Sequence, residues 1–143
     1  MFVFDTDHLV ILQRQSPSAY DSLLQQIGQY APADFFVSII SFHEQVMGWN
    51  AYISQAKDPR VTVRGYERLQ KVLSNFSRAQ VLPFDDPSAI ISDNLRKRRI
   101  RIGTMDLRIA AIALSRDMTV LTRNVRDFSR VPGLKVEDWT APA

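Results

Sequence analysis

The sequence predicts an α/β fold in which helices cover both faces of a central, twisted, mostly parallel sheet of about five strands, giving three layers. The first observation behind this prediction is that short apolar segments alternate with longer amphipathic ones along the whole chain. The second is the absence of a fixed-period repeat or a low-complexity tract. The length of 143 residues suits one domain spanning 1–143, and 45% hydrophobic residues suffice for its core.

Two strands and four helices are expected in the first half of the chain. In order, we expect a strand at 2–4, a helix beginning at 9–12, a helix over 18–27, a strand at 35–37 and a long helix from Ser41 to about Ala56. The Lys-Asp-Pro stretch at 57–59 breaks that helix. A second long helix follows, because four large side chains recur at helical spacing: Tyr66, Leu69, Leu73 and Phe76.

The second half repeats the alternation. In order, we expect a strand at 81–84 stopped by 85–87, a helix over 89–99, a break at 103–104, a helix over 105–116, a strand at 119–121, a helical turn near 126–128 and a strand at 134–136. Consecutive parallel strands joined through helices form right-handed crossovers. Ligands of such sheets bind beyond the carboxyl ends of the strands, so the site is expected there.

The composition limits the chemistry. The chain has no cysteine, which excludes disulfides, thiolate metal sites and a cysteine nucleophile. No segment is long and apolar enough to cross a membrane, and a strand-like run at the start leaves no room for a signal peptide. We therefore expect a cytoplasmic protein. The net charge of +3 permits a polyanionic partner without requiring one.

Two acidic residues follow the first two strands. Asp5 closes the strand at 2–4 and therefore reaches the carboxyl edge of the sheet, although a helix N-cap is an equally good interpretation of Asp5 or Asp7. Glu44 follows the strand at 35–37 and points to the same edge. Its spacing from Ser41 is also that of a capping box, which for Glu44 alone is the stronger interpretation.

Further polar residues lie at the same edge later in the chain. Asp106 falls in the first turn of a helix for which Thr104 is the expected N-cap, so the helix dipole alone explains an acid there. However, Ala110 and Ala113 share its helix face, which favours a functional carboxylate on a buried helix. Thr122 and Asp127 follow the strand at 119–121, and a surface turn is the alternative for Asp127.

The acidic residues are most informative as a group. Carboxylates gathered at one edge repel one another unless a cation neutralises them or one is protonated. Oxygen ligands alone suit Mg²⁺ or Mn²⁺, and no His-x-x-x-His or cysteine pair indicates zinc. The two histidines, His8 and His43, are interpreted as packing or supporting residues rather than as ligands.

Four sequence features together resemble the PIN domain family, and most closely the VapC toxins of bacterial toxin–antitoxin pairs. They are Asp5-Thr6-Asp7, Glu44 after the second strand, Gly-Thr-x-Asp-x-x-Ile-Ala-Ala at 103–111, and Thr-x-Asn-x-x-Asp-Phe-x-x-Val-Pro-Gly-Leu at 122–134. The resemblance spans the chain. Its departures are Asp7 where the family often has Asn, Met105 where a polar residue is common, and Arg123 where Asn is frequent.

The resemblance implies a Mg²⁺- or Mn²⁺-dependent endoribonuclease with a protruding helical arm. It places the catalytic metal ligands at Asp5, Glu44, Asp106 and Asp127, and polar catalytic helpers at Thr6 and Thr122. It further implies an RNA substrate, a VapB-like antitoxin held by the arm, and a homodimer. Five basic residues just before Asp106 are equally consistent with RNA contact and with a solvated helix end: Arg96, Lys97, Arg98, Arg99 and Arg101.

Two other functions fit parts of the sequence. The segment from Phe2 to Asp7 also resembles the nucleophile motif of haloacid dehalogenase-like phosphatases, in which Asp5 would attack phosphate and Asp7 would act as acid and base. Against this, Asp85 and Asp86 precede Thr122, whereas the acidic metal motif of that superfamily comes last. The other alternative is a non-catalytic PIN-like RNA-binding protein, which the intact set of acids disfavours.

Overall fold

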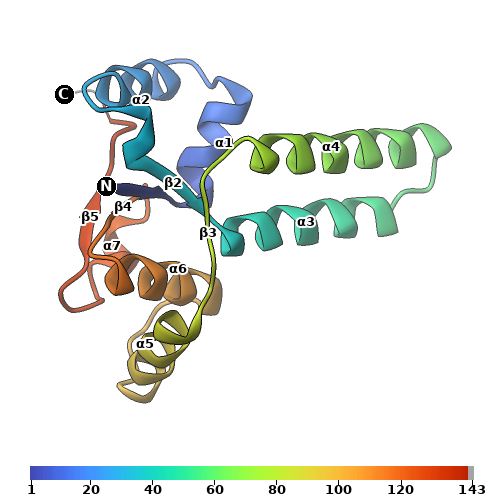
Figure 1. Ribbon diagram of the computed structural model, residues 1–143. Coiled ribbons are helices and arrows are strands. Elements are labelled where there is room, and N and C mark those ends of the chain that lie inside the picture. Colours follow the sequence, from blue (N-terminus) through green and yellow to red (C-terminus); the bar gives the residue numbers. More distant parts are fainter. Residues whose placement is uncertain (142–143) are drawn as a thin grey trace.

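A computed structural model describes residues 1–141, so residues 142 and 143 of the expected domain lie outside the described part of the chain. The elements alternate as expected (Figure 1). In chain order they are β1 (Phe2–Phe4), α1 (Thr6–Arg14), α2 (Ala19–Ile27), the 3-10 helix η1 (Pro32–Asp34), β2 (Phe35–Ser38), α3 (Ile39–Ser54), α4 (Pro59–Ser77), β3 (Val81–Leu82), α5 (Asp86–Lys97), α6 (Thr104–Ser115), β4 (Thr119–Leu121), α7 (Val125–Phe128) and β5 (Lys135–Glu137).

The five strands form one sheet in the order β3-β2-β1-β4-β5, and each neighbouring pair is parallel. This confirms the predicted α/β class and the parallel sheet. β1 is the central strand: Phe2 lies opposite Phe35 of β2 on one side and Thr119 of β4 on the other. The first strand of the chain therefore delivers the next residue, Asp5, to the middle of the carboxyl edge.

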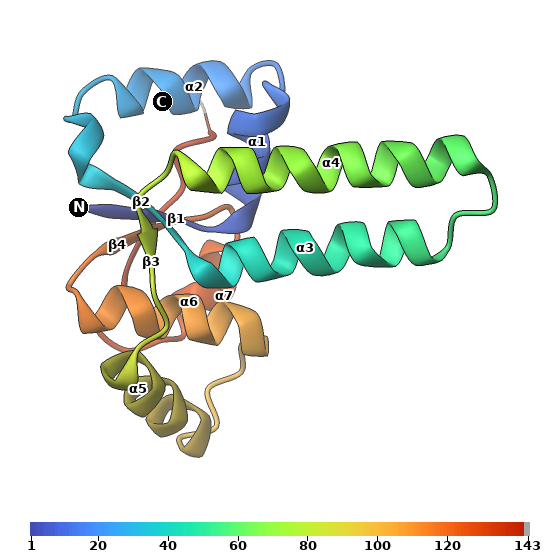
Figure 2. The ribbon, with the colours of Figure 1, turned by 45° about the vertical axis from the view of Figure 1, so that its right-hand side comes forward.

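The alternating side chains of β1 divide the core between the two faces of the sheet. Val3 joins a cluster with buried residues of α6, including Ile109 and Ile112. Phe2 and Phe4 point to the opposite face and join a cluster with α1, α2 and α4 that includes Leu23. Figures 1 and 2 show α1 and α2 on one side of the sheet and α5 and α6 on the other, so the three expected layers are present.

The helices α3 and α4 form an arm that extends away from the sheet (Figure 2). Asp58 begins α4: its side chain accepts a hydrogen bond from the backbone N–H of Arg60, and Pro59 occupies the first turn. Gly65 lets the helices approach closely, because a Cβ at this position would collide with the side chain of Ile53. The arm expected from the resemblance is therefore present.

Several expected boundaries were wrong, and Ser38 explains the most important one. Its side chain accepts a hydrogen bond from the Ser41 N–H at 3.2 Å, so α3 begins at Ile39 rather than Ser41. Ser41 is thus not the N-cap, and the capping-box interpretation of Glu44 is wrong. Helix α1 likewise begins at Thr6, immediately after its cap Asp5.

Two further helix starts also differ from those that the apolar pattern predicts. Gly103, rather than Thr104, occupies the N-cap position of α6 and offers no capping side chain. Helix α5 begins at Asp86 because the Asp85 side chain caps it, which shortens β3 to two residues. Within residues 1–141, none of the helices has the length and apolar character needed to span a membrane.

Candidate metal centre

Three carboxylates from distant parts of the chain meet at the carboxyl edge of the sheet. One ligand oxygen each of Asp5, Glu44 and Asp106 lies within 4.8 Å of the other two. Asp5 follows the central strand, Glu44 lies in the second turn of α3, and Asp106 lies in the first turn of α6. The structure thus brings together three of the four acids expected to hold metal.

Asp5 is the most buried of the three, at 6% exposure. One carboxylate oxygen accepts the Thr6 N–H and the other accepts the Thr122 hydroxyl, both at 2.8 Å. Burial, assisted by the charges of Asp7 and Asp106, raises the pKa of Asp5 to about 7 against these two hydrogen bonds. Asp5 therefore both caps α1 and contributes to the cluster, so the two interpretations of this residue are compatible.

Glu44 is held from the side of α1. The Thr6 hydroxyl lies 3.0 Å from a Glu44 carboxylate oxygen and 3.0 Å from the Ser41 hydroxyl. Burial, together with the charge of Asp106, raises the pKa of Glu44, and the hydrogen bond from Thr6 opposes this. Because α3 begins two residues earlier than the sequence suggested, Glu44 lies in its second turn and faces the cluster instead of capping its own helix.

Asp106 and Asp127 are joined by Asn124. The Asn124 side-chain amide donates to Asp106 at 3.4 Å and to Asp127 at 3.1 Å. Asp127 also forms an ion pair with Arg130 at 3.2 Å. It lies outside the cluster of three carboxylates found among residues 1–141. Burial and the charges of Asp7 and Asp127 raise the pKa of Asp106, while Asn124 acts in the opposite direction.

Comparison with known proteins adds to this geometry. The sequence profile described as "PIN domain" matches residues 2–134 of the chain. The chain belongs to the PIN domain family. Ribonuclease VapC1 of Rickettsia felis is 30% identical over 138 residues, which cover 94% of this chain and 92% of that protein. The tRNA(fMet)-specific endonuclease VapC of Salmonella typhimurium is 41% identical over 78 residues, 51% of this chain and 59% of that one.

Solved structures show the same architecture for this PIN domain. A chain in the crystal structure of DNA-bound VapBC from Salmonella typhimurium has a TM-score of 0.72 and 26% identity. The match covers 96% of this chain and 97% of that one. The α/β/α arrangement is therefore shared with a solved structure and is not a peculiarity of this chain.

The donor set of this PIN domain suits a hard divalent cation. The cluster offers only carboxylate oxygens, which are the ligands that Mg²⁺ and Mn²⁺ prefer. Among residues 1–141, none of the three carboxylates forms an ion pair with a basic side chain. All three also have raised pKa values, mainly through burial, so a positive charge at this position would relieve an unfavourable concentration of negative charge.

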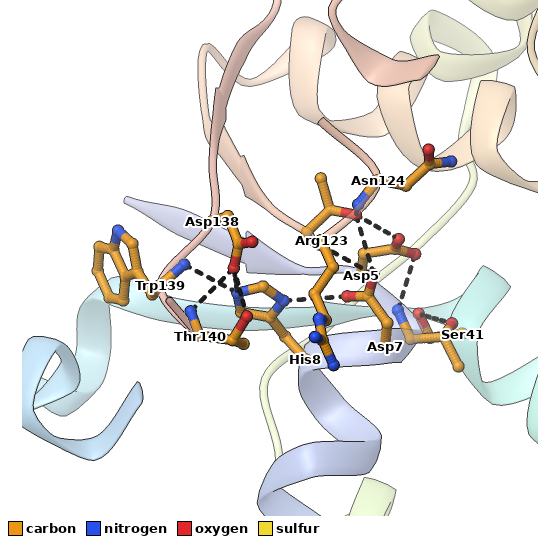
Figure 3. A network of polar contacts seen from close by, with 11 residues as sticks. Asp5, Asp7, His8, Ser41, Arg123, Asn124, Asp138, Trp139 and Thr140 are labelled. Atoms are coloured by element: carbon orange, nitrogen blue, oxygen red, sulfur yellow. Dashed lines mark hydrogen bonds and ion pairs between the residues drawn. The ribbon is translucent and has the colours of Figure 1, made fainter. Parts of the chain in front are cut away.

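Two residues that received no catalytic role from the pattern lie in this network (Figure 3). Asn124 links two acids, and its place at the exit of β4 was the available signal. His8 is fully buried and contacts Asp7 with one ring nitrogen and the backbone of Trp139 with the other. Nothing in the local sequence indicates the second contact, because the partners are 131 residues apart.

Proposed function

We propose that this PIN domain is a metal-dependent endoribonuclease and the toxin of a VapBC-type toxin–antitoxin pair. The observation that carries the proposal is the convergence of Asp5, Glu44 and Asp106 without a neutralising basic partner in the described part of the chain. The names of the relatives support RNA as substrate, since two of them are called ribonuclease or tRNA-specific endonuclease. Mg²⁺ or Mn²⁺ is the proposed cofactor.

We assign the roles from the geometry of the site. Asp5 and Asp106 are the principal metal ligands, and Glu44 completes the ligand set or orients the attacking water. Asp127, which Asn124 links to Asp106, would hold a second and weaker ion. Thr122, which hydrogen-bonds Asp5, helps to position water or a phosphate oxygen. When bound, the metal supplies an activated water and stabilises charge on the phosphoryl oxygens.

The reaction is hydrolysis of a phosphodiester. By family resemblance, the products carry a 5′-phosphate and a 3′-hydroxyl. The carboxylates keep the site negative until a cation arrives, so an RNA phosphate is repelled from the metal-free centre. Asp5 is buried, and a carboxylate shielded from water attracts a cation more strongly than an exposed one does.

Basic residues beside the centre fit an RNA backbone. Of the five predicted residues, Arg96 and Lys97 are engaged with Asp93, at 2.7 Å and 2.9 Å. The other three, Arg98, Arg99 and Arg101, form no ion pair among residues 1–141. Their loop lies next to the centre, because the Arg101 carbonyl accepts a hydrogen bond from Arg130, the partner of Asp127. We propose that these three contact RNA phosphates.

The arm offers a surface for the proposed antitoxin. A groove of about 490 Å³ lies between α3 and α4, with side chains that include Phe42, Val46 and Leu69. Tyr66 and Leu73 at its border are 57% and 62% exposed. We propose that an amphipathic segment of a VapB-like antitoxin covers it, because a similar chain was crystallised as a VapBC complex. The homodimer stays a prediction, to be tested by measuring the mass of the purified chain in solution.

Asp106→Asn tests the nuclease proposal. We expect the wild-type chain to cleave RNA with Mg²⁺ or Mn²⁺ and to be inactive with a chelator. The Asn variant should be inactive while its circular dichroism spectrum is unchanged, because the substitution keeps the side-chain shape and removes only the charge. Metal-dependent cleavage by a clean Asp106→Asn preparation would overturn the assignment. No observation favours the phosphatase or non-catalytic alternatives over this function.

A further inference from the structure

Two side chains beside the cluster have no part in the proposed chemistry: Asp7 and His8. One Asp7 oxygen lies 3.0 Å from His8 Nδ1, and the other accepts the Arg123 N–H at 2.9 Å and lies 3.3 Å from the Thr122 hydroxyl. His8 has no exposed surface, and its Nε2 lies 3.2 Å from the Trp139 backbone nitrogen. The two side chains therefore connect three segments: α1, the turn after β4 and the C-terminal segment (Figure 3).

The direction of each hydrogen bond in this chain of contacts is fixed. The Trp139 backbone N–H is only a donor, so His8 Nε2 must accept and carries no proton. Nδ1 then carries the proton and donates to Asp7. Every ring nitrogen of His8 and both oxygens of Asp7 are used. Asp138, 3.7 Å from Nε2, is already engaged by the N–H and hydroxyl of Thr140.

The turn at residues 122–124 contacts Asp7 on one side and the carboxylates of the cluster on the other. Thr122 donates to Asp5 and accepts the Asn124 N–H at 2.9 Å. Asn124 in turn donates to Asp106 and Asp127. A shift of this turn would therefore move the partners of three of the four carboxylates. Asp7 holds the turn by its backbone, because it accepts the Arg123 N–H at 2.9 Å.

We propose that Asp7 and His8 are positioning residues that hold the 122–124 turn against α1 and thereby set the carboxylates of Asp5 and Asp106 for cation binding. This rests on the proposed function only in assigning the cluster to a metal. Neither residue is a ligand or a catalytic residue. His8 acts through Asp7 on one side, and on the other it anchors Trp139, whose indole packs 4.7 Å from the ring of Phe2.

The two residues form a matched pair. An Asn at position 7 would place its amide hydrogens against either His8 Nδ1–H or the Arg123 N–H, since both are donors. Avoiding this conflict by moving the His8 proton to Nε2 would leave the Trp139 N–H facing another donor. A buried donor without an acceptor is costly, so Asp7 is the residue that this histidine requires.

Two isosteric replacements of the ring separate its two contacts. In His8→Asn the amide occupies the place of Nδ1 and can still donate to Asp7, whereas the contact with Trp139 is lost. In His8→Gln the amide reaches the place of Nε2 and can accept from Trp139, whereas the support of Asp7 is lost. We expect the affinity for Mn²⁺, measured by calorimetry, to be about tenfold weaker in His8→Gln than in His8→Asn. Asp7→Asn should weaken this affinity by about tenfold to a hundredfold relative to wild type.

A role in packing alone predicts the opposite order, because Asn leaves the larger void. Equal affinities in the two His8 variants, or weaker binding in His8→Asn, would overturn the proposal. Nitrogen NMR gives a readout that needs no metal. The wild-type ring should carry its proton on Nδ1, and the amide signals of Arg123 and Asn124 should shift more in His8→Gln than in His8→Asn. If the wild-type chain binds no Mn²⁺ but the amide shifts follow this order, the metal assignment fails and the positioning role stands.

Discussion

Replacing Asp5 by Asn should stabilise the metal-free protein at neutral and alkaline pH. The pKa of Asp5 is raised from 3.8 to about 7, so the folded state binds a proton that the unfolded chain has already released. Proton binding by Asp5 therefore favours the folded state. This stabilisation is complete at low pH, and it is lost as the pH rises towards 7. The difference corresponds to about 4 kcal/mol above pH 7, which is an upper limit because the cluster relaxes.

The pH dependence separates this effect from an ordinary change in packing. Between pH 5 and pH 8, the free energy of unfolding of the wild-type chain should fall by about 2–3 kcal/mol relative to that of Asp5→Asn. The reason is that position 5 titrates in this window when it is Asp and not when it is Asn. Urea unfolding with a chelator present, repeated across the range, measures the difference directly. In thermal unfolding the same gap amounts to roughly 3 °C for each kcal/mol.

Asp117→Asn provides the matched control, because it makes the same chemical change at a side chain that is 87% exposed and, among residues 1–141, forms an ion pair only with Lys135. Its stability should stay within about 0.5 kcal/mol of wild type at every pH. A stability difference between Asp5→Asn and wild type that is independent of pH would refute the assigned electrostatic cause. So would an Asn variant that is less stable than wild type at pH 8.

Three further outcomes follow from the structure. Mn²⁺ at a hundred times its dissociation constant should stabilise the wild-type chain by about 2.7 kcal/mol, and Asp5→Asn by clearly less, as read from thermal unfolding. Gly65→Ala should lower stability by about 1–3 kcal/mol, because the added Cβ collides with Ile53; an unchanged melting temperature would show that the two arm helices separate freely. Replacing Arg98, Arg99 and Arg101 with Ala should reduce the salt dependence of binding to uncleavable RNA by about 2 in log–log slope, and an unchanged slope would remove them from the RNA contact surface.

The layers and the parallel sheet could be predicted from the sequence because they depend on periodicity. Residues 2–4 and 119–121 are short, mainly apolar runs that each end before a polar residue, and each forms a strand. The residues at which helices begin were harder to predict, because they depend on single hydrogen bonds such as that from the Ser41 N–H to the Ser38 side chain. The error at Ser41 mattered most, because for Glu44 taken alone it favoured a capping role that the structure does not give it.

The candidate site could be predicted from the sequence only in part, for a different reason. Asp5, Glu44 and Asp106 each follow a predicted strand or begin a predicted helix, so topology alone directed them to one edge. The supporting contacts of His8 and Asn124 depend on which loops meet in space. His8 reaches Trp139, and Asn124 reaches back to Asp106, over separations that no short motif encodes.

The central position of β1 has a consequence for how the chain is synthesised. This strand is synthesised well before its neighbour β4, and Thr122 and Asp5 lie 117 residues apart. A nascent chain lacking β4 has the acids at positions 5, 44 and 106 but neither the strand nor the hydroxyl that holds the first of them. The centre therefore cannot be complete until β4 and Thr122 have been synthesised and have joined the sheet beside β1.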